Sequence, residues 1–483
     1  MRYSRSVAVY PRAIADGDPL YGEQWAWKKM EAESAWGRLR EAERAQPTVA
    51  IVDWGIQRDH EDLNSELVSG ARVIPPYNGD FSDDYGHGTM LAGTIGARAN
   101  NDRGGRGAVP SARLLAIKFI DVRTPPMSKY AAKAIKCAVD GGAQIINVSW
   151  DVGLNDDDLR RGFEYAAERC RLLVVAAGND GSDNGRYRAF PATFGLPNMI
   201  VVTASDRRDQ KPGFSNYGEN VDLAAPGVDI VTTSPYLRRP PARPSRLYNG
   251  AYRSYSGTSA AAAHVSGAAA LLLSIDERWR PEEIRDHLIA SADPVNDLKG
   301  VCRAEGRLNL RRAVLGPFEI TASRQGQELV VEWSCNYRSR VVETASLSLI
   351  DCDSSIAVSL AQRLDTRGRR NFPIPNTPMA RAFVRVESGE RRLYTDSEPL
   401  CIVSSYPSKP SPPARRPQGG SSPALMLEST PPVATNLIAS DRLVSVGRYA
   451  SRCRRSCSPS NPVSQSRRPL CSLAPAPRRV APA

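Results

Sequence analysis

Three side chains that together can perform nucleophilic catalysis occur in the first 260 residues, each in a distinctive local sequence. Asp53 ends the apolar run TVAIVD, His87 lies between two glycines in YGHGT, and Ser259 follows Gly257 in GTSAAAAHVSG. In this kind of catalysis an imidazole takes the proton of a hydroxyl that attacks a carbonyl, and a carboxylate holds the imidazole in the required tautomer. The three residues are therefore candidates for the acid, the base and the nucleophile.

Both His87 and Ser259 stand immediately before runs of small residues, which are typical of deeply buried helices. The glycines beside His87 let other backbone approach the ring closely. A hydroxyl at the start of a helix is exposed to the positive end of the helix dipole and to the free N–H groups of the first turn. A plain N-cap is the alternative role for Ser259, and that role is compatible with catalysis.

The elements that must position these residues are predicted from four short apolar runs, at 48–53, 145–150, 172–178 and 199–205. Each run is rich in β-forming residues and does not alternate with polar ones, as in strands that are buried on both faces of a parallel sheet. Helical patterns lie between them at 127–142 and 156–170, and two more helices are expected after Gly257. This succession indicates an α/β fold with a doubly wound, mostly parallel sheet.

Polar residues follow three of these strands: Asp53, the pair Ser149 and Trp150, and Asn179. Sites in open parallel sheets form beyond the carboxyl ends of the strands, so these side chains are expected to converge. Such edges also carry polar turn residues for structural reasons alone. In the catalytic interpretation, the Asn179 amide and the backbone N–H of Ser259 bind the oxyanion that forms during the attack.

Over about residues 18–314 the chain resembles the subtilisin-like serine proteases, or subtilases, in a series of segments in the family's order. These are DPLYGEQW, VAIVDWGIQRDHEDL, GHGT, INVSW, VVAAGN, FPAT, LAAPGVDI, GTSAAAAHVSG and EGRLNLRRAV. The resemblance implies a serine endopeptidase that hydrolyses peptide bonds of protein substrates through an Asp-His-Ser triad and an acyl-enzyme intermediate.

The same resemblance implies which residues bind the substrate. The backbone of Ser149, Trp150 and Asp151 is expected to pair with an extended substrate as an added β-strand. The pocket for the side chain before the cut is expected to be lined by Ala177, Phe190, Pro191 and Ala192.

The resemblance also implies a structural calcium ion, because the family's strong calcium site maps to Asp18, Asp62 and Asn101. Backbone carbonyls of the loop ANNDRGGRG (99–107) would complete an all-oxygen shell that suits Ca²⁺. Surface turns and helix caps are the alternative role for these residues. No organic cofactor is implied.

Among the positions that depart from the family pattern, two bear on activity, because the family has Ser or Thr after the catalytic aspartate and usually Gly at the position of Asp151. This chain has Trp54 and Asp151 there. Trp54 removes a supporting hydroxyl, and either its indole N–H replaces that donor or the acid is shifted. Asp151 either favours basic residues in the substrate or obstructs the cleft. These departures leave open a second function, that of a catalytically weak or inactive peptide-binding protein on a subtilase fold.

Past Gly316 the sequence alternates apolar and polar residues between turn-forming stretches, which indicates a small antiparallel β-sandwich at 317–402. From 403 to 483 the chain is rich in Pro, Ser and Arg and is expected to be a disordered basic tail. The predicted organisation is therefore a short N-terminal extension (1–17), a peptidase domain (18–316), the β-sandwich and the tail.

The net charge of +12 does not by itself indicate a nucleic-acid partner, because it is concentrated at one end of the chain. Residues 401–483 hold twelve Lys or Arg against two acidic residues, a net +10, and leave about +2 for the rest. Specific nucleic-acid binding is not expected, although electrostatic binding by the tail is an alternative. No apolar run reaches the ~20 residues of a membrane span. A monomer is expected, cytoplasmic as the sequence is written and secreted if its N-terminus is incomplete.

Overall fold

The computed structural model describes residues 17–401, apart from 42–44, 125–127, 153–154, 236–249, 317, 336–344, 353–356, 366, 376–378, 380, 389–393 and 398–399. The predicted tail at 403–483 and all but the last residue of the predicted extension at 1–17 lie outside the described residues.

A nine-stranded sheet carries the first part of the chain, and its strand order is β10-β11-β7-β6-β5-β4-β1-β3-β2. All neighbouring strands run parallel except β10, which is antiparallel to β11. The strands are β1 (Thr48–Asp53), β2 (Val68–Arg72), β3 (Arg113–Lys118), β4 (Ile145–Val148), β5 (Leu172–Ala176), β6 (Met199–Ser205), β7 (Leu223–Pro226), β10 (Asp293–Pro294) and β11 (Gly306–Arg307). The α/β prediction with a mostly parallel sheet is confirmed.

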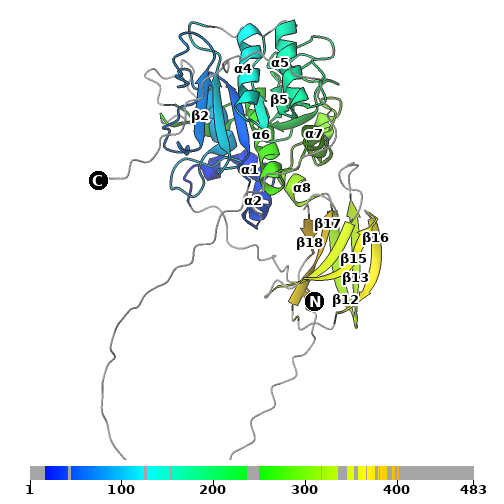
Figure 1. The fold of residues 1–483 in the computed structure, drawn as a ribbon. Coiled ribbons are helices and arrows are strands. Elements are labelled where there is room, and N and C mark those ends of the chain that lie inside the picture. The colour runs from blue at the N-terminus through cyan, green and yellow to red at the C-terminus, as the bar shows by residue number, and fades with distance from the viewer. Residues whose placement is uncertain are drawn as a thin grey trace, which may run out of the picture. The chain divides into compact units, whose positions relative to one another are not determined.

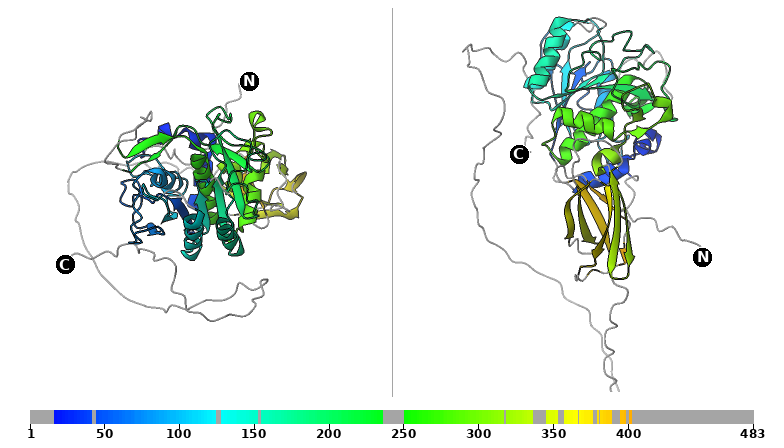
Figure 2. Two further views of the ribbon diagram at one scale, coloured as in Figure 1. Left: turned by 90° about the horizontal axis from the view of Figure 1, so that it is seen from above. Right: turned by 90° about the vertical axis from the view of Figure 1, so that its right-hand side faces the viewer.

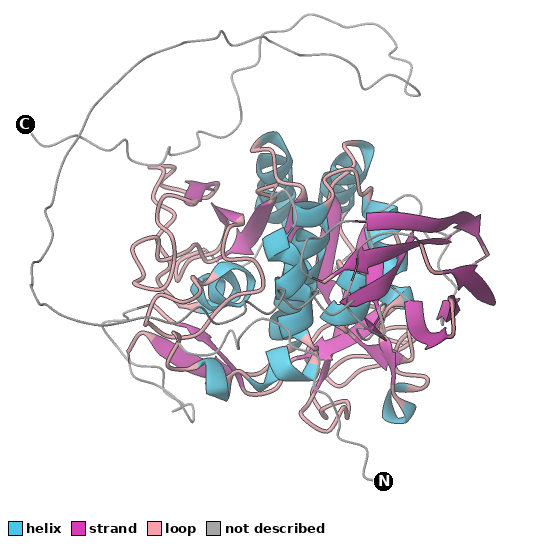
Figure 3. Cartoon of the chain, turned by 90° about the horizontal axis from the view of Figure 1, so that it is seen from below, coloured by secondary structure: helices cyan, strands magenta, loops and turns pink. Residues whose placement is uncertain are grey.

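Helices cover both faces of this sheet, as Figures 1 and 3 show. On one face α4 (Ser128–Asp140) and α5 (Asp157–Glu168) pack side by side (Figure 2), and on the other lie α3 (His87–Gly96) and α6 (Thr258–Ile275). Successive residues of β1 point into the two separate cores, Val49 into one and Ala50 into the other. Burial on both faces explains why the strand sequences do not alternate. The remaining helices are η1 (Tyr21–Glu23), α1 (Trp25–Lys29), α2 (Ala32–Glu41), α7 (Pro281–Ala290), η2 (Asn296–Leu298) and α8 (Leu310–Leu315).

The helix α6 is buried along its whole length, because small side chains let it sink against its neighbours. A Cβ at Gly267 would lie 2.4 Å from the Cβ of Ala108, so the backbone itself is in close contact there. Among the described residues it is the one helix long and apolar enough to cross a membrane by length and composition, and its full burial is that of a core helix.

A short antiparallel pair, β8 (Ile230–Thr233) and β9 (Tyr252–Tyr255), holds α3 in place. The hydroxyl of Thr233 donates to the carbonyl of Thr89 (2.7 Å), and that of Thr232 donates to the carbonyl of Met90 (3.0 Å). Side-chain hydrogen bonds of this kind fix the first turn of α3, the turn that begins with His87.

The predicted β-sandwich is present as two antiparallel sheets that share one apolar core. In β14 every second residue is buried, which matches the alternating sequence. One sheet consists of β12 (Phe318–Gln325), β13 (Glu328–Cys335) and β16 (Arg367–Pro373). The other consists of β14 (Ala345–Asp351), β15 (Ala357–Leu364), β17 (Arg381–Ser388), β18 (Tyr394–Asp396) and β19 (Leu400–Cys401). The exact domain boundaries stay predictions.

Candidate active site

The carboxylate of Asp53 and the imidazole of His87 form a direct pair at the carboxyl edge of the sheet. The Nδ1 atom of His87 lies 2.9 Å from one carboxylate oxygen of Asp53 and 3.0 Å from the other. Asp53 is the last residue of β1 and is buried, whereas the His87 side chain is 20% exposed. A buried carboxylate on Nδ1 leaves Nε2 as the nitrogen available to accept a proton.

The glycines on the two sides of His87 are needed for different structural reasons. Gly86 adopts φ = 111°, a left-handed conformation in which other residues are strained. A Cβ at Gly88 would lie 2.0 Å from the carbonyl oxygen of Gly55, so the loop after β1 can approach only a glycine. Together they place the imidazole beside Asp53.

Asp83 fixes the start of α3, a role that the sequence analysis did not assign. One carboxylate oxygen accepts from the backbone N–H of Gly86 (2.7 Å), and the other accepts from the N–H and hydroxyl of Thr89 (2.8 and 2.7 Å). Acidic residues before a glycine-initiated helix are the sequence signal for such a cap.

The charge environment of His87 favours its protonated form. Burial of the ring lowers its pKa, but the charge and hydrogen bond of Asp53, with a smaller contribution from Asp83, raise it, and the net pKa is above 6.5. An imidazolium is thus stabilised at the position where a general base would receive a proton.

Ser259 is the second residue of α6 and is almost fully buried. Its hydroxyl donates to the backbone carbonyl of Ser149 (3.2 Å), and the Ser149 hydroxyl donates in return to the carbonyl of Ser259 (3.3 Å). The Ser259 hydroxyl therefore does not donate to His87 in this structure. In serine enzymes this contact often tightens only when substrate is bound.

Asn179 follows β5 and is held by the first residue of α6. Its side-chain oxygen accepts from the backbone N–H of Thr258 (2.9 Å) and from the Thr258 hydroxyl (3.1 Å). The amide NH₂ is left as the donor of this exposed side chain. The structure thus brings Asn179 and Ser259 together through Thr258, a residue that the sequence analysis did not single out.

The predicted substrate strand passes next to Ser259. Trp150 is anchored by its indole N–H, which donates to the carbonyl of Val52 (2.7 Å), and its ring packs on Phe119. Asp151 is exposed and lines a pocket of about 340 Å³ together with Phe190. It does not fill the cleft, so its side chain leaves this space open.

Of the residues predicted for the substrate pocket, three are buried and do not line this cavity, and their role in substrate binding stays a prediction: Ala177, Pro191 and Ala192. The carbonyl of Ala177 accepts from the side-chain amide of Asn216 (3.1 Å), which does line the pocket. Ala177 thus supports the pocket wall through Asn216.

Trp54 leaves the acid in place. The carboxylate of Asp53 accepts the backbone N–H of Trp54 (2.9 Å), while the indole stacks on Tyr85 with ring centroids 4.5 Å apart. The indole N–H does not replace the missing hydroxyl donor. Backbone support is sufficient for Asp53 to keep its contact with His87.

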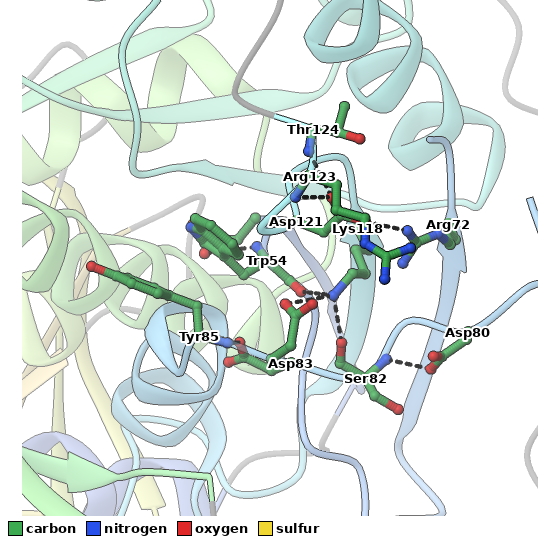
Figure 4. A network of polar contacts seen from close by, with 12 residues as sticks. Trp54, Arg72, Asp80, Ser82, Asp83, Tyr85, Lys118, Asp121, Arg123 and Thr124 are labelled. Carbon is green, nitrogen blue, oxygen red and sulfur yellow. Dashed lines mark hydrogen bonds and ion pairs between the residues drawn. The ribbon is translucent and has the colours of Figure 1, made fainter. Parts of the chain in front are cut away.

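A buried lysine, Lys118, joins the segment of Trp54, just after β1, to the segment of Ser82, before α3 (Figure 4). Lys118, at the end of β3, is paired in register with Asp53, and its side chain is only 2% exposed. Its ammonium donates to the carbonyls of Trp54 (2.9 Å) and Ser82 (2.7 Å) and to the Asp84 carboxylate (2.9 Å). The only sequence signal for this role is a lysine that ends the otherwise apolar run LLAIK.

The residues predicted for calcium are adjacent to one another. The Asp18 carboxylate accepts the backbone N–H groups of Asn100 (2.9 Å) and Asn101 (3.1 Å), and the Asn101 amide donates to Asp62 (3.0 Å). Burial raises the pKa of the Asp62 carboxyl to about 8, against the opposing effect of hydrogen bonds from Asn101 and Gly105.

This donor set fits a hard cation. Asp18 and Asp62 are both buried, and neither has an ion-pair partner within the part of the chain that the structure describes. The described residues contain no group of three His, Cys, Asp or Glu, so amide and backbone oxygens would have to complete a shell. Oxygen ligands of this mixed kind are those that Ca²⁺ accepts.

Known proteins resemble this chain over the same region. Residues 44–314 match the Subtilase family. Thermitase from Thermoactinomyces vulgaris is 34% identical over 302 residues, which cover 62% of this chain and 98% of thermitase. Subtilisin E from Bacillus subtilis is 34% identical over 245 residues, which cover 50% of this chain and 60% of that protein. A solved structure of a protease from Pseudoalteromonas arctica has the same fold, with a TM-score of 0.53 at 23% identity over 62% of this chain and 98% of that one.

Proposed function

The chain belongs to the subtilase family and is a subtilisin-like serine endopeptidase, and we propose that it cuts protein substrates through Asp53, His87 and Ser259. The observation that carries this assignment is the 2.9 Å contact between Asp53 and His87 at the sheet edge where Ser259 and Asn179 also lie. An acid, a base, a hydroxyl and an amide donor at one edge are the groups that acyl transfer requires.

In the proposed acylation step, Nε2 of His87 takes the proton of Ser259 as Oγ attacks the peptide carbonyl carbon. Asp53 stabilises the imidazolium that results, in keeping with the raised pKa of His87. The carbonyl oxygen gains negative charge and accepts from the Asn179 amide and the backbone N–H of Ser259. His87 then protonates the leaving amine as the C–N bond breaks. In the second half, His87 takes a proton from water, which attacks the acyl carbon, and returns it to Oγ of Ser259 as the ester bond breaks and the acid product leaves.

A calcium ion at Asp18, Asp62 and Asn101 is part of the proposal. It is supported by the buried carboxylates without ion-pair partners among the described residues. A bound Ca²⁺ would supply the positive charge that these carboxylates lack and would tie the loop 99–107 to the segment at Asp18. Its contribution is to stability, because no residue of the triad is among its ligands.

The proposal is tested with a fluorophosphonate probe, which reacts only with an activated serine. The purified protein is expected to be labelled, and Ser259→Ala is expected to abolish the labelling. Ser256→Ala, three residues earlier on the exposed surface, is the matched control and is expected to be labelled like the parent. Absence of labelling in a folded, calcium-loaded sample would refute the assignment.

One observation favours the second candidate, a peptide-binding protein with weak or no activity. The hydroxyl of Ser259 donates to the backbone carbonyl of Ser149 and forms no hydrogen bond with His87. That function predicts peptide binding that Ser259→Ala leaves unchanged, together with no cleavage of a protein substrate. Measurable proteolysis that depends on Ser259 excludes it.

A further inference from the structure

The pocket beside Asn179 has an acidic lining that the family resemblance does not explain. Two carboxylates face it, Asp151 and Asp180, together with Tyr187, Arg188, Phe190 and Asn216. We propose that this pocket binds the cationic side chain of a lysine or arginine in the substrate, and that Asp151 and Asp180 determine this preference. The inference rests on the proposed function, because it concerns the residue that precedes the bond to be cut.

The pocket is directly connected to the catalytic groups. Asp180 follows Asn179, and its backbone N–H donates to the Asn216 side chain (3.0 Å). Asp151 lies two residues after Ser149, whose carbonyl accepts the Ser259 hydroxyl (3.2 Å). A side chain that enters this pocket therefore belongs to a substrate residue close to the attacked carbonyl.

The two walls of the pocket are joined by a backbone hydrogen bond. The N–H of Val152, next to Asp151, donates to the carbonyl of Phe190 (3.1 Å). This bond holds the carboxylate of Asp151 and the aromatic ring of Phe190 on the same opening. This backbone contact keeps the segment of Asp151 next to the segment of Phe190.

Neither acid is neutralised within the described residues. The side chains of Asp151 and Asp180 form no ion pair, and both residues are exposed at the pocket mouth. The two carboxylates line the same cavity, and partial burial, followed by the charge of Asp180, raises the pKa of Asp151. A cation in the pocket relieves this repulsion, whereas a neutral guest does not.

The aromatic part of the lining suits the rest of a lysine or arginine side chain. Tyr187 is 69% exposed and Phe190 is half-buried, so their rings offer apolar surface to an aliphatic stem. Long basic side chains characteristically pack their methylene groups on apolar surface and keep the charged end near polar groups. A large neutral aromatic side chain of the substrate is the competing ligand, because it gains the apolar contact but not the charge interaction.

Arg188 supplies an internal test, because it lines the same pocket with the opposite charge. It forms no ion pair with Asp151 or Asp180 in the structure, so the lining carries two negative charges and one positive charge. Removing Arg188 must therefore act in the direction opposite to removing either acid. A role that is merely structural would not produce this opposition of signs.

The experiment compares peptide substrates that differ only in the residue before the cut: Arg, Lys, Gln and Phe. Parent, Asp151→Asn, Asp180→Asn and Arg188→Ala are measured, and fluorophosphonate titration of each variant gives the concentration of active sites. Asp157→Asn is the matched control, because this exposed acid in α5 changes the net charge equally and does not line the pocket.

The parent is expected to prefer Arg and Lys over Gln and Phe in kcat/KM. Each Asp→Asn variant should lower the Arg/Gln ratio by up to about fivefold, as for solvated charge pairs. Arg188→Ala should raise the ratio, Asp157→Asn should leave it unchanged, and higher salt should reduce the parent's preference.

Two failures are distinguishable. If the parent is labelled by the probe but prefers Phe, or if the Asp→Asn variants keep the parent's Arg/Gln ratio, the specificity inference is wrong and the proposed function stands. If the folded protein is neither labelled nor active on any of the four peptides, the proposed function itself is wrong.

Discussion

The side-chain oxygen of Asn179 accepts two hydrogen bonds from Thr258, one from the backbone N–H at 2.9 Å and one from the hydroxyl at 3.1 Å. Because both bonds occupy the oxygen, the NH₂ group is the part of the amide that remains to donate to a substrate. Thr258 immediately precedes Ser259, so the proposed oxyanion donor and the nucleophile are positioned through one residue.

Substitutions at Asn179 and Thr258 should therefore lower the rate of the same catalytic step, by different factors. Asn179→Ala removes the donor and is expected to lower kcat by about 10²–10³-fold. Thr258→Val keeps the volume and the backbone bond but removes the hydroxyl, which also contacts the backbone of Gly178, and at least about a tenfold loss of kcat is expected. Steady-state kinetics should show KM nearly unchanged in both variants. A rise in KM with kcat unchanged would instead assign Thr258 to substrate binding.

The pH dependence of kcat/KM should follow the proton on His87. A general base acts only when neutral. Burial of the His87 ring lowers its pKa, but the charge of Asp53 raises it, and the net pKa is above 6.5. Activity is thus expected to be lost as the pH falls through a pKa above 6.5, and to be retained above it. Asp53→Asn removes the raising charge, so the acidic limb should move to lower pH while kcat falls by about 10⁴-fold. An acidic limb that stays in place in Asp53→Asn would contradict the pairing.

Lys118 should contribute to both stability and turnover, because its ammonium satisfies two backbone carbonyls next to the catalytic loops. Lys118→Met leaves these carbonyls buried without a donor, and the free energy of unfolding should fall by at least about 2 kcal/mol. The measurement is denaturant unfolding in a Ser259→Ala background, which prevents self-digestion. In the protein that retains Ser259, Lys118→Met should lower kcat. Lys118→Arg keeps the charge and should lose less stability and less kcat. Equal losses in the two variants would refute a role for the charge.

Calcium should stabilise the folded chain through Asp62. In the Ser259→Ala background, adding Ca²⁺ at about 100 times its Kd to a chelator-treated sample should stabilise the fold by about 2.7 kcal/mol, with a corresponding rise in Tm. Asp62→Asn removes a carboxylate ligand and should abolish the rise. Mg²⁺ at the same concentration is the control and should have little effect, because it prefers smaller octahedral sites. A Tm that does not respond to Ca²⁺ would refute the proposed site.

The sequence by itself determined the sheet and its catalytic edge. Strands β1, β4 and β5 were predicted because burial on both faces demands an apolar run without alternation, as Ala50 and Ile51 illustrate in their separate cores. The carboxyl ends of parallel strands share one edge, so the residues that follow them had to meet. The glycines beside His87 were also interpretable, since a close backbone approach excludes a Cβ.

Only the tertiary structure decided how the side chains at that edge are used. It placed the Ser259 hydroxyl on Ser149, left Asp151 at the mouth of an open pocket and brought Lys118 to two loops from other parts of the chain. The physical reason is that these features depend on side-chain torsions and on contacts between segments distant in sequence. Periodicity and spacing describe local geometry, and they contain no information on which distant group fills a given hydrogen bond.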